Sequence, residues 1–223
     1  MNTLPIQRSD YLKIRREGIG LNRQILKLLR PSDAQTCGRH LGLLKKKTLV
    51  FNNDSEFNIF CEYQIHAYRP NGVSMTELYL RLNRDRLDAF TLALLQRLST
   101  ARYSVLSVDS VGKDTLEVTD ILRGISFTLM DIGLSQTVRP GNALAGYIAS
   151  FDDFSIHCGG LLAIDKKLLL ADEPMRVLNK FELLRDEGAS ALPPDLGAKL
   201  ARAIMSTAIR LGYTEHTIFA DPK

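Results

Sequence analysis

The chain has 223 residues, of which 45% are hydrophobic and 24% charged, and its formal net charge is +4. A chain of this length can bury a core without disulfide staples, and its composition excludes a mostly disordered or low-complexity protein. Three widely spaced cysteines exclude a disulfide framework, and the absence of an apolar leader or of about eighteen consecutive apolar residues favours a cytoplasmic protein outside the membrane.

Apolar residues at helical spacing predict a series of helices over the first hundred residues. Gly18 and Gly20 interrupt the pattern between Leu12 and Leu29, which predicts two short helices there. Ser74 precedes Glu77 by the three residues of a capping box, so a helix is expected to begin at that point. The segments predicted to be helical are 12–29 (as two helices), 32–44, 56–68, 74–82 and 85–100.

The apolar pattern changes from a helical period to strict alternation at Tyr103, which predicts β-strands. Closely spaced short strands with glycine at the turns favour a small antiparallel barrel or a strongly curled sheet. Helical spacing returns for the last fifty residues, with Gly212 as the C-cap of the final helix. We therefore expect an α+β fold in three regions, namely a helical region (1–101), a β module (102–171) and a C-terminal helical segment (172–223).

One set of short segments comprises His40–Leu44 leading into Leu49–Phe51, Ala67–Gly72 followed by Tyr79 and Leu80, and Leu116–Gly124 with Arg139–Gly141. Taken together, these segments resemble a group of uncharacterised bacterial proteins. In that group a helical half precedes a small β module, and some members carry an SEC-C metal-binding tail. The resemblance covers about residues 38–170. Because no cysteine follows Cys158, the tail is absent, and the resemblance implies an architecture without an activity.

Positive charge is concentrated at the N-terminus. Residues 1–50 carry a net charge of +8, whereas residues 51–223 carry −4. Such a basic segment can bind nucleic acid or an acidic partner, although similar patterns also form the solvated faces of amphipathic helices. The predicted β module is itself acidic, so any contact with nucleic acid is expected from the helices. The candidate binding residues are Arg15, Arg16, Arg23, Lys27, Lys45, Lys46 and Lys47.

Two thiols and two imidazoles supply the residue types of a zinc site. They are Cys37, His40, Cys61 and His66. Four such ligands can close a tetrahedral site, but this spacing is not that of a standard zinc finger. A buried, inert cysteine on a helix face explains Cys61 equally well. We therefore predict no metal and no cofactor, and keep these four residues as the alternative.

The adjacent pair His157 and Cys158 is the candidate for nucleophilic catalysis, with Asp153 as the group that orients the histidine. Neighbouring residues of a strand face opposite sides, so the pair needs a bend, which Gly159 and Gly160 can provide. The same residues are also typical of an ordinary strand that ends in a glycine turn.

No nucleotide-binding or zinc-protease motif occurs in the chain. The leading functional hypothesis is accordingly a non-enzymatic binding or adaptor protein, acting on a protein partner or by self-association. Nucleic-acid binding through the basic N-terminal helices and a thiol-dependent enzyme centred on Cys158 are the alternatives. The sequence predicts no membrane partner.

Overall fold

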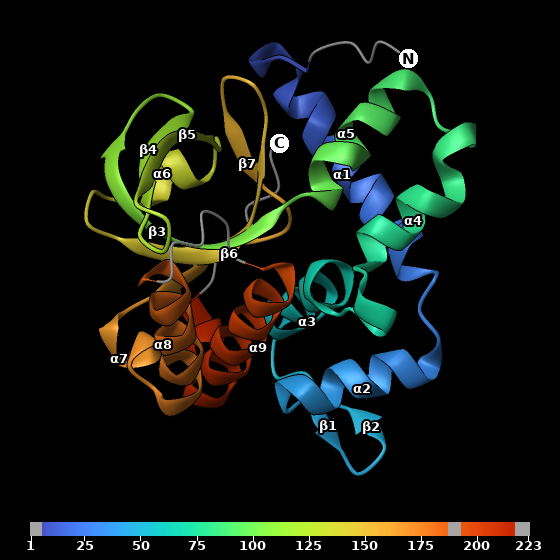
Figure 1. Cartoon of the computed structure of the whole chain (residues 1–223), viewed down its shortest axis with the longest axis vertical. Coiled ribbons are helices and arrows are strands. Elements are labelled where there is room, and N and C mark those ends of the chain that lie inside the picture. Colours follow the sequence, from blue (N-terminus) through green and yellow to red (C-terminus); the bar gives the residue numbers. More distant parts are fainter. Residues whose placement is uncertain (1–5, 187–192, 217–223) are drawn as a thin grey trace.

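The computed structural model describes residues 6–186 and 193–216. It has helices at both ends and a small closed β-barrel in the middle, so the predicted α+β class is confirmed. Figure 1 shows the barrel with α1, α4 and α5 on one side and α7, α8 and α9 on another. The α-helices are α1 (Tyr11–Leu26), α2 (Pro31–Leu41), α3 (Asp54–Glu62), α4 (Met75–Asn83), α5 (Ala89–Ser99), α6 (Leu134–Thr137), α7 (Lys166–Leu169), α8 (Asp172–Asp186) and α9 (Pro194–Leu211).

Shorter elements connect these helices. A π-helical turn, η2 (Tyr63–Ala67), continues directly from α3, and single 3₁₀ turns lie at η1 (Arg8–Asp10), η3 (Pro70–Gly72), η4 (Arg84–Arg86) and η5 (Tyr213–His216). The strands are β1 (Leu44–Lys45), β2 (Thr48–Leu49), β3 (Arg102–Val111), β4 (Thr115–Asp120), β5 (Ile125–Met130), β6 (Ala143–Ser150), β7 (Ser155–His157) and β8 (Leu162–Ile164).

Five strands close the barrel in the order β3-β4-β5-β7-β6, with β6 pairing back to β3. Strand β8 joins the same sheet beside β6. All of these pairings are antiparallel except β5 with β7, which are parallel and share the single Cα pair Leu129 and Ser155. This parallel seam closes the barrel and brings the ends of β5 and β7 side by side.

Strand β3 is buried on both faces, so its apolar residues lie on both sides of the strand. Leu106 and Val108 face the barrel interior, and Tyr103 and Val105 belong to the core formed with the surrounding helices. Residues of α9 supply much of the core between the barrel and the helices, and α9 packs directly on β3. The barrel is therefore held from inside by its own side chains and from outside by helices.

Helix α1 is continuous, so the predicted break at Gly18 and Gly20 was wrong. Its buried residues Ile14, Leu21 and Ile25 recur at helical spacing across the glycines. Each interior glycine costs a helix roughly 1 kcal/mol relative to alanine, whereas one fully buried Ile or Leu contributes about 1.5–3 kcal/mol. Burial of this face therefore outweighs the glycine penalty.

Helix caps occur where the residue types require them. The Ser74 side chain accepts a hydrogen bond from the Glu77 N–H at 3.2 Å, which confirms the predicted start of α4. Asp88 caps α5 in the same way, three residues later than the predicted start of that helix. Gly212 adopts the left-handed conformation after α9, with φ of 77°, and confirms the predicted C-cap.

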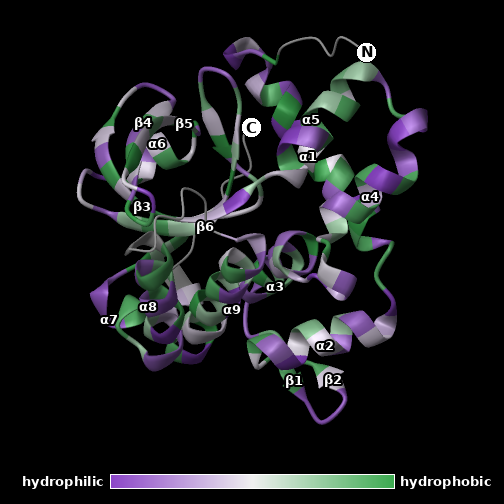
Figure 2. Ribbon diagram, viewed as in Figure 1, coloured by the Kyte–Doolittle hydropathy of each residue, from purple (hydrophilic) through white to green (hydrophobic). Residues whose placement is uncertain are grey.

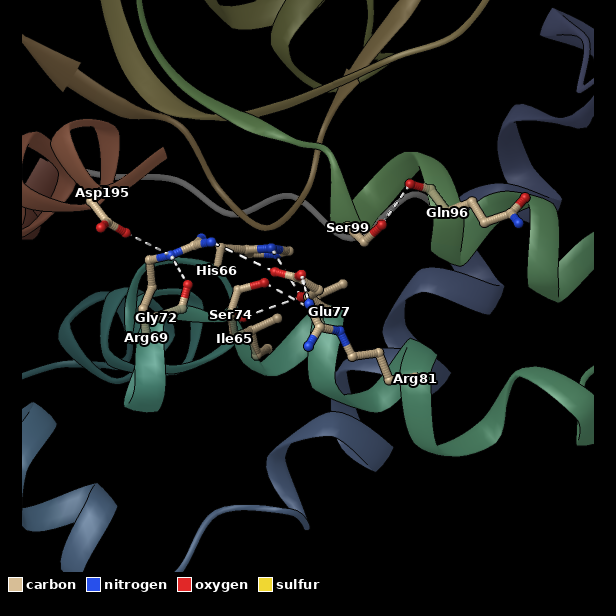
Figure 3. A network of polar contacts seen from close by, with 11 residues as sticks. Ile65, His66, Arg69, Gly72, Ser74, Glu77, Arg81, Gln96, Ser99 and Asp195 are labelled. Carbon is tan, nitrogen blue, oxygen red and sulfur yellow. Dashed lines mark hydrogen bonds and ion pairs between the residues drawn. The ribbon is translucent and has the colours of Figure 1, made fainter. Parts of the chain in front are cut away.

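Arg69 joins the N-terminal helices to α9. Figure 3 shows its guanidinium between Asp195 and Glu77, with Nε 3.2 Å from Asp195 Oδ1 and Nη2 3.6 Å from Glu77 Oε2. Glu77 also pairs with Arg81 at 2.5 Å. These charges are partly exposed, so each pair contributes at most about 1 kcal/mol, and the network mainly orients α9.

Hydrophobic and hydrophilic residues alternate along the helices in Figure 2 rather than forming uniformly hydrophobic rods. Among the described helices, none has both the length and the apolar composition that spanning a membrane requires.

Candidate functional site

A cavity of about 520 Å³ lies where α1, α3 and the barrel meet. This size is in the range of pockets that bind small molecules. We call it the α1 cavity. Its walls come from α1, the end of α3 with η2, the segment 131–137 after β5, and the segment 156–161 around the end of β7. The lining includes Arg15, Phe57, Glu62, Leu134, His157 and Gly159.

Arg15 is one of two arginines that line the cavity. It shares one face of α1 with Ile19, Asn22 and Leu26, all of which line the cavity at helical spacing. Its Nη1 donates a hydrogen bond to the backbone oxygen of His157 at 3.0 Å. No carboxylate among the described residues lies within ion-pair distance of Arg15. Because a guanidinium has five N–H donors, Arg15 retains donors for a ligand.

Asp131 and His157 form a buried pair at the cavity wall. His157 Nε2 lies 2.6 Å from Asp131 Oδ2, which also accepts from the Tyr11 hydroxyl at 3.2 Å. Burial opposes ionisation of Asp131, but the hydrogen bonds from His157 and from the Leu134 N–H lower its pKa to about 2.

The imidazole of this pair is neutral at neutral pH. Burial, aided by the positive charge of Arg15, lowers the pKa of His157 below its ordinary value despite the Asp131 carboxylate. The neutral ring therefore donates its Nε2 proton to Asp131. Its Nδ1 then carries a lone pair, and that atom is buried without a hydrogen-bond partner among the described residues.

Glu62 is a second buried carboxyl group, 6% exposed, at the junction between α3 and η2. Its Oε2 accepts the Gly160 N–H at 3.0 Å, whereas its buried Oε1 has no partner in the described part of the chain. Burial raises the pKa of Glu62 to about 7, although the N–H groups of Gly160 and Tyr147 and the charge of Arg15 oppose this rise. Perturbed carboxyl groups in a cleft are typical of functional sites, and so are π-helical turns.

The glycine pair after His157 allows the close approach of Glu62. A Cβ atom at Gly159 would lie 3.1 Å from the Glu62 carboxyl group. A larger residue at that position would require the Glu62 carboxyl group to shift by a few tenths of an ångström. Gly159 and Gly160 were predicted to bend the chain near Cys158, and the structure gives them this additional role of packing against Glu62.

The thiol of Cys158 also lines the cavity, but it is not set up as a nucleophile. Burial, with a smaller contribution from Glu62, raises its pKa far above the ordinary value, so the protonated thiol predominates. Asp153, the predicted orienting group, is 62% exposed at its side chain and pairs with Arg8 at 3.5 Å. The carboxylate that contacts His157 is instead Asp131.

Two of the four candidate zinc ligands, His40 and His66, contact other side chains. His40 Nδ1 lies 2.9 Å from the Tyr63 hydroxyl, and the His66 ring stacks on Tyr147 with centroids 5.2 Å apart. Cys37 is fully buried in the core, and Cys61 and His66 line the α1 cavity. Within residues 6–186 and 193–216, no three His, Cys, Asp or Glu side chains are grouped closely enough to hold a metal ion.

The candidate binding residues fall into two separate groups. Arg15, Arg16, Arg23 and Lys27 lie on or just after α1, and both Arg15 and Arg23 line the cavity. Lys45 ends β1, and Lys46 and Lys47 form the turn between β1 and β2, where Lys46 has a φ of 59°; all three lysines are exposed. Figure 1 shows this turn at the far end of the molecule from the barrel. The basic segment is therefore not one continuous surface.

A family model matches residues 6–182, and its description is a family of unknown function, DUF7986. The chain belongs to this family. The DUF7986 segment contains every residue that lines the α1 cavity, from Ile14 to Leu161, whereas α9 lies beyond it. The chain matches no curated protein and no solved structure at a significant level. The resemblance to bacterial proteins with SEC-C tails stays a prediction.

Proposed function

We propose that the chain is a binding protein whose α1 cavity takes up a small amphiphilic anion. The observation that carries the proposal is Arg15, a half-buried cation that lines the cavity and retains free N–H donors. A carboxylate, sulfonate or phosphate group is the complement of such a guanidinium.

The charges around the cavity favour an anion. Arg15 and Arg23 line it without an ion-pair partner among the described residues. The two carboxyl groups of the lining already accept hydrogen bonds, Asp131 from His157, Tyr11 and Leu134, and Glu62 from the Gly160 N–H. The cations Arg16 and Lys27 lie on or just after the same helix and add to the positive potential around it.

Two exposed hydrophobic side chains of the cavity lining indicate that the ligand also has an apolar part. Ile19 of α1 is 40% exposed and Phe57 of α3 is 50% exposed. Large apolar side chains that line a cavity and remain open to water mark a surface that a ligand can cover. We therefore expect the charged end of the ligand at Arg15 and its apolar body against Ile19 and Phe57.

The test uses two fluorescent probes with the same dansyl ring, the anionic dansylglycine and the neutral dansylamide. We expect saturable, one-to-one binding of dansylglycine and weaker binding of dansylamide, because only the former has a carboxylate. Arg15→Gln should weaken dansylglycine at least tenfold, since a hydrogen bond to a charged group contributes about 1.5–3 kcal/mol. Arg16→Gln, which changes the neighbouring exposed cation, is the matched control and should have little effect.

A second pair of variants tests the place of binding. Gly18 lines the cavity, and a Cβ atom there would meet nothing within 4 Å, so Gly18→Leu should fill the cavity without disturbing α1. Gly20 is equally unobstructed but does not line it, so Gly20→Leu is the control. No binding of dansylglycine, or equal binding by the Gly18→Leu and Gly20→Leu variants, would refute the proposal.

The other hypotheses from the sequence stay predictions. A protein partner, self-association and nucleic-acid binding rest on the basic α1 face and on the lysine turn between β1 and β2. The thiol enzyme has less support, because burial keeps Cys158 protonated and Asp153 pairs with Arg8.

A further inference from the structure

We propose that the α1 cavity takes up its anionic ligand together with one proton, and that the carboxyl group of Glu62 holds this proton. The inference rests on the proposed function, because it describes how the same cavity responds to an anion. It assigns to Glu62 the role of a specificity-determining residue that favours anions over neutral molecules as the pH falls.

Among the described residues, Arg15 is the cation whose charge stabilises the ionised form of Glu62, and both side chains line the cavity. Tyr103 of β3, Tyr147 of β6 and Cys158 after β7 are neutral groups around Glu62. His66 of η2 stacks on Tyr147 and is also neutral, because burial lowers its pKa to about 3. The remaining charged group nearby, Asp131, is coupled to the same Arg15.

Few groups stabilise the ionised form of Glu62, and the charge of Arg15 adds to the N–H groups of Gly160 and Tyr147. Glu62 Oε2 accepts the Gly160 N–H, but its Oε1 is buried without a hydrogen-bond partner within the described structure. Gly159 packs against the carboxyl group, and a Cβ atom at Gly146 would lie 3.7 Å from Oε1, so both sides are closed by backbone. A buried carboxylate with so few partners is costly, whereas the protonated form is not.

Binding of an anion removes the electrostatic stabilisation that the charge of Arg15 gives to ionised Glu62. An anion that pairs with Arg15 neutralises the positive charge that favoured ionised Glu62 and places a like charge beside the carboxyl group. Both effects favour protonation of Glu62. By linkage, protonation of Glu62 must favour binding of the anion to the same extent.

The expected change of the dissociation constant with pH follows from the fraction of molecules in which Glu62 is protonated. With a pKa of about 7, Glu62 is protonated in about nine-tenths of the molecules at pH 6 and in about one-tenth at pH 8. If the anion binds only the protonated form, the dissociation constant rises about tenfold between these two pH values. Dansylamide carries no charge and should show no such change.

The first experiment measures the dissociation constant of dansylglycine from pH 6 to pH 8 in three proteins. The unmodified protein should show the tenfold change, and Glu62→Gln should bind with a constant affinity because its amide is always neutral. Glu56→Gln changes another buried carboxyl group of α3 that does not line the cavity, and should keep the tenfold change. Equal pH dependence in the unmodified protein and Glu62→Gln would overturn the inference.

The second experiment counts protons directly. Calorimetric titration with dansylglycine at pH 7, in two buffers of different ionisation enthalpy, should show an uptake of about half a proton per ligand, and none in Glu62→Gln.

The Glu62 side-chain carbonyl carbon, followed by NMR in the unmodified protein, should titrate at higher pH when the protein is saturated with dansylglycine. An unchanged titration midpoint would overturn the inference even if the variant failed to fold.

The outcomes separate the two proposals. If dansylglycine does not bind, both fail. If it binds, is excluded by Gly18→Leu and shows no proton uptake, the proposed function stands and the role of Glu62 is wrong.

Discussion

The substitution Glu62→Gln should stabilise the protein, and it should do so increasingly as the pH rises. The folded protein holds the pKa of Glu62 at about 7, against 4.5 for an ordinary glutamate. A carboxyl group whose pKa is raised by folding contributes stability below its unfolded pKa and loses this contribution as the pH rises to its folded pKa. The loss therefore occurs between about pH 4.5 and pH 7.

The magnitude follows from the difference between the two pKa values, which is about 2.5. Each pKa unit corresponds to about 1.4 kcal/mol, so ionised Glu62 lowers the free energy of unfolding by about 3 kcal/mol above pH 7. At pH 5 the same group lowers it by only about 1 kcal/mol. The neutral amide that Glu62→Gln introduces avoids this penalty at both pH values and can still accept the Gly160 N–H.

Urea unfolding of the two proteins at pH 5 and pH 8 measures this effect. The advantage of Glu62→Gln over the unmodified protein should be larger by about 2 kcal/mol at pH 8 than at pH 5. Comparing the two pH values cancels any constant effect of the substitution on packing. An advantage that is the same at both pH values would show that Glu62 is ionised at little cost and would refute the account of its surroundings.

Three further predictions concern other parts of the molecule. Gly20→Ala should raise the free energy of unfolding by about 0.5–1 kcal/mol, because Gly20 lies in the interior of α1 with open space around it; a lower thermal midpoint would contradict this. Arg123→Met should lower the free energy of unfolding in urea by about 3–5 kcal/mol, since it leaves the buried Asp120 carboxylate without its partner, and adding Asp120→Asn should recover part of the loss. Cys158 should react slowly with a thiolate-selective reagent at neutral pH until the protein is unfolded, and rapid labelling of the folded protein would refute a protonated, half-buried thiol.

Much of the fold could be predicted because local patterns encode it. The alternation that begins at Tyr103 located the strands within a few residues, and the Ser74–Glu77 spacing located the start of α4. The π-helical turn after Glu62 and the short helix α6 were not predicted. Both depend on contacts with distant segments, and neither has a period of its own in the sequence.

The candidate site was predicted only in pieces. Arg15 was singled out as a binding residue and the pair His157 and Cys158 as a candidate for catalysis, and the structure places all three around one cavity. Glu62 and Asp131 were missed because each matters through residues far away in the chain. Asp131 meets His157 only because the parallel seam brings the ends of β5 and β7 together, and no local pattern indicates which strands close a barrel.

The bond between Arg15 and the backbone of His157 spans 142 positions of the chain. A ribosome adds about 5–20 residues per second, so α1 leaves the exit tunnel roughly 7–28 s before the residues that complete the cavity. During this interval the nascent chain exposes the apolar face of α1 to chaperones and proteases. Translation that stops before β7 should therefore yield a polypeptide for degradation, because no earlier stopping point leaves α1 with its full set of neighbours.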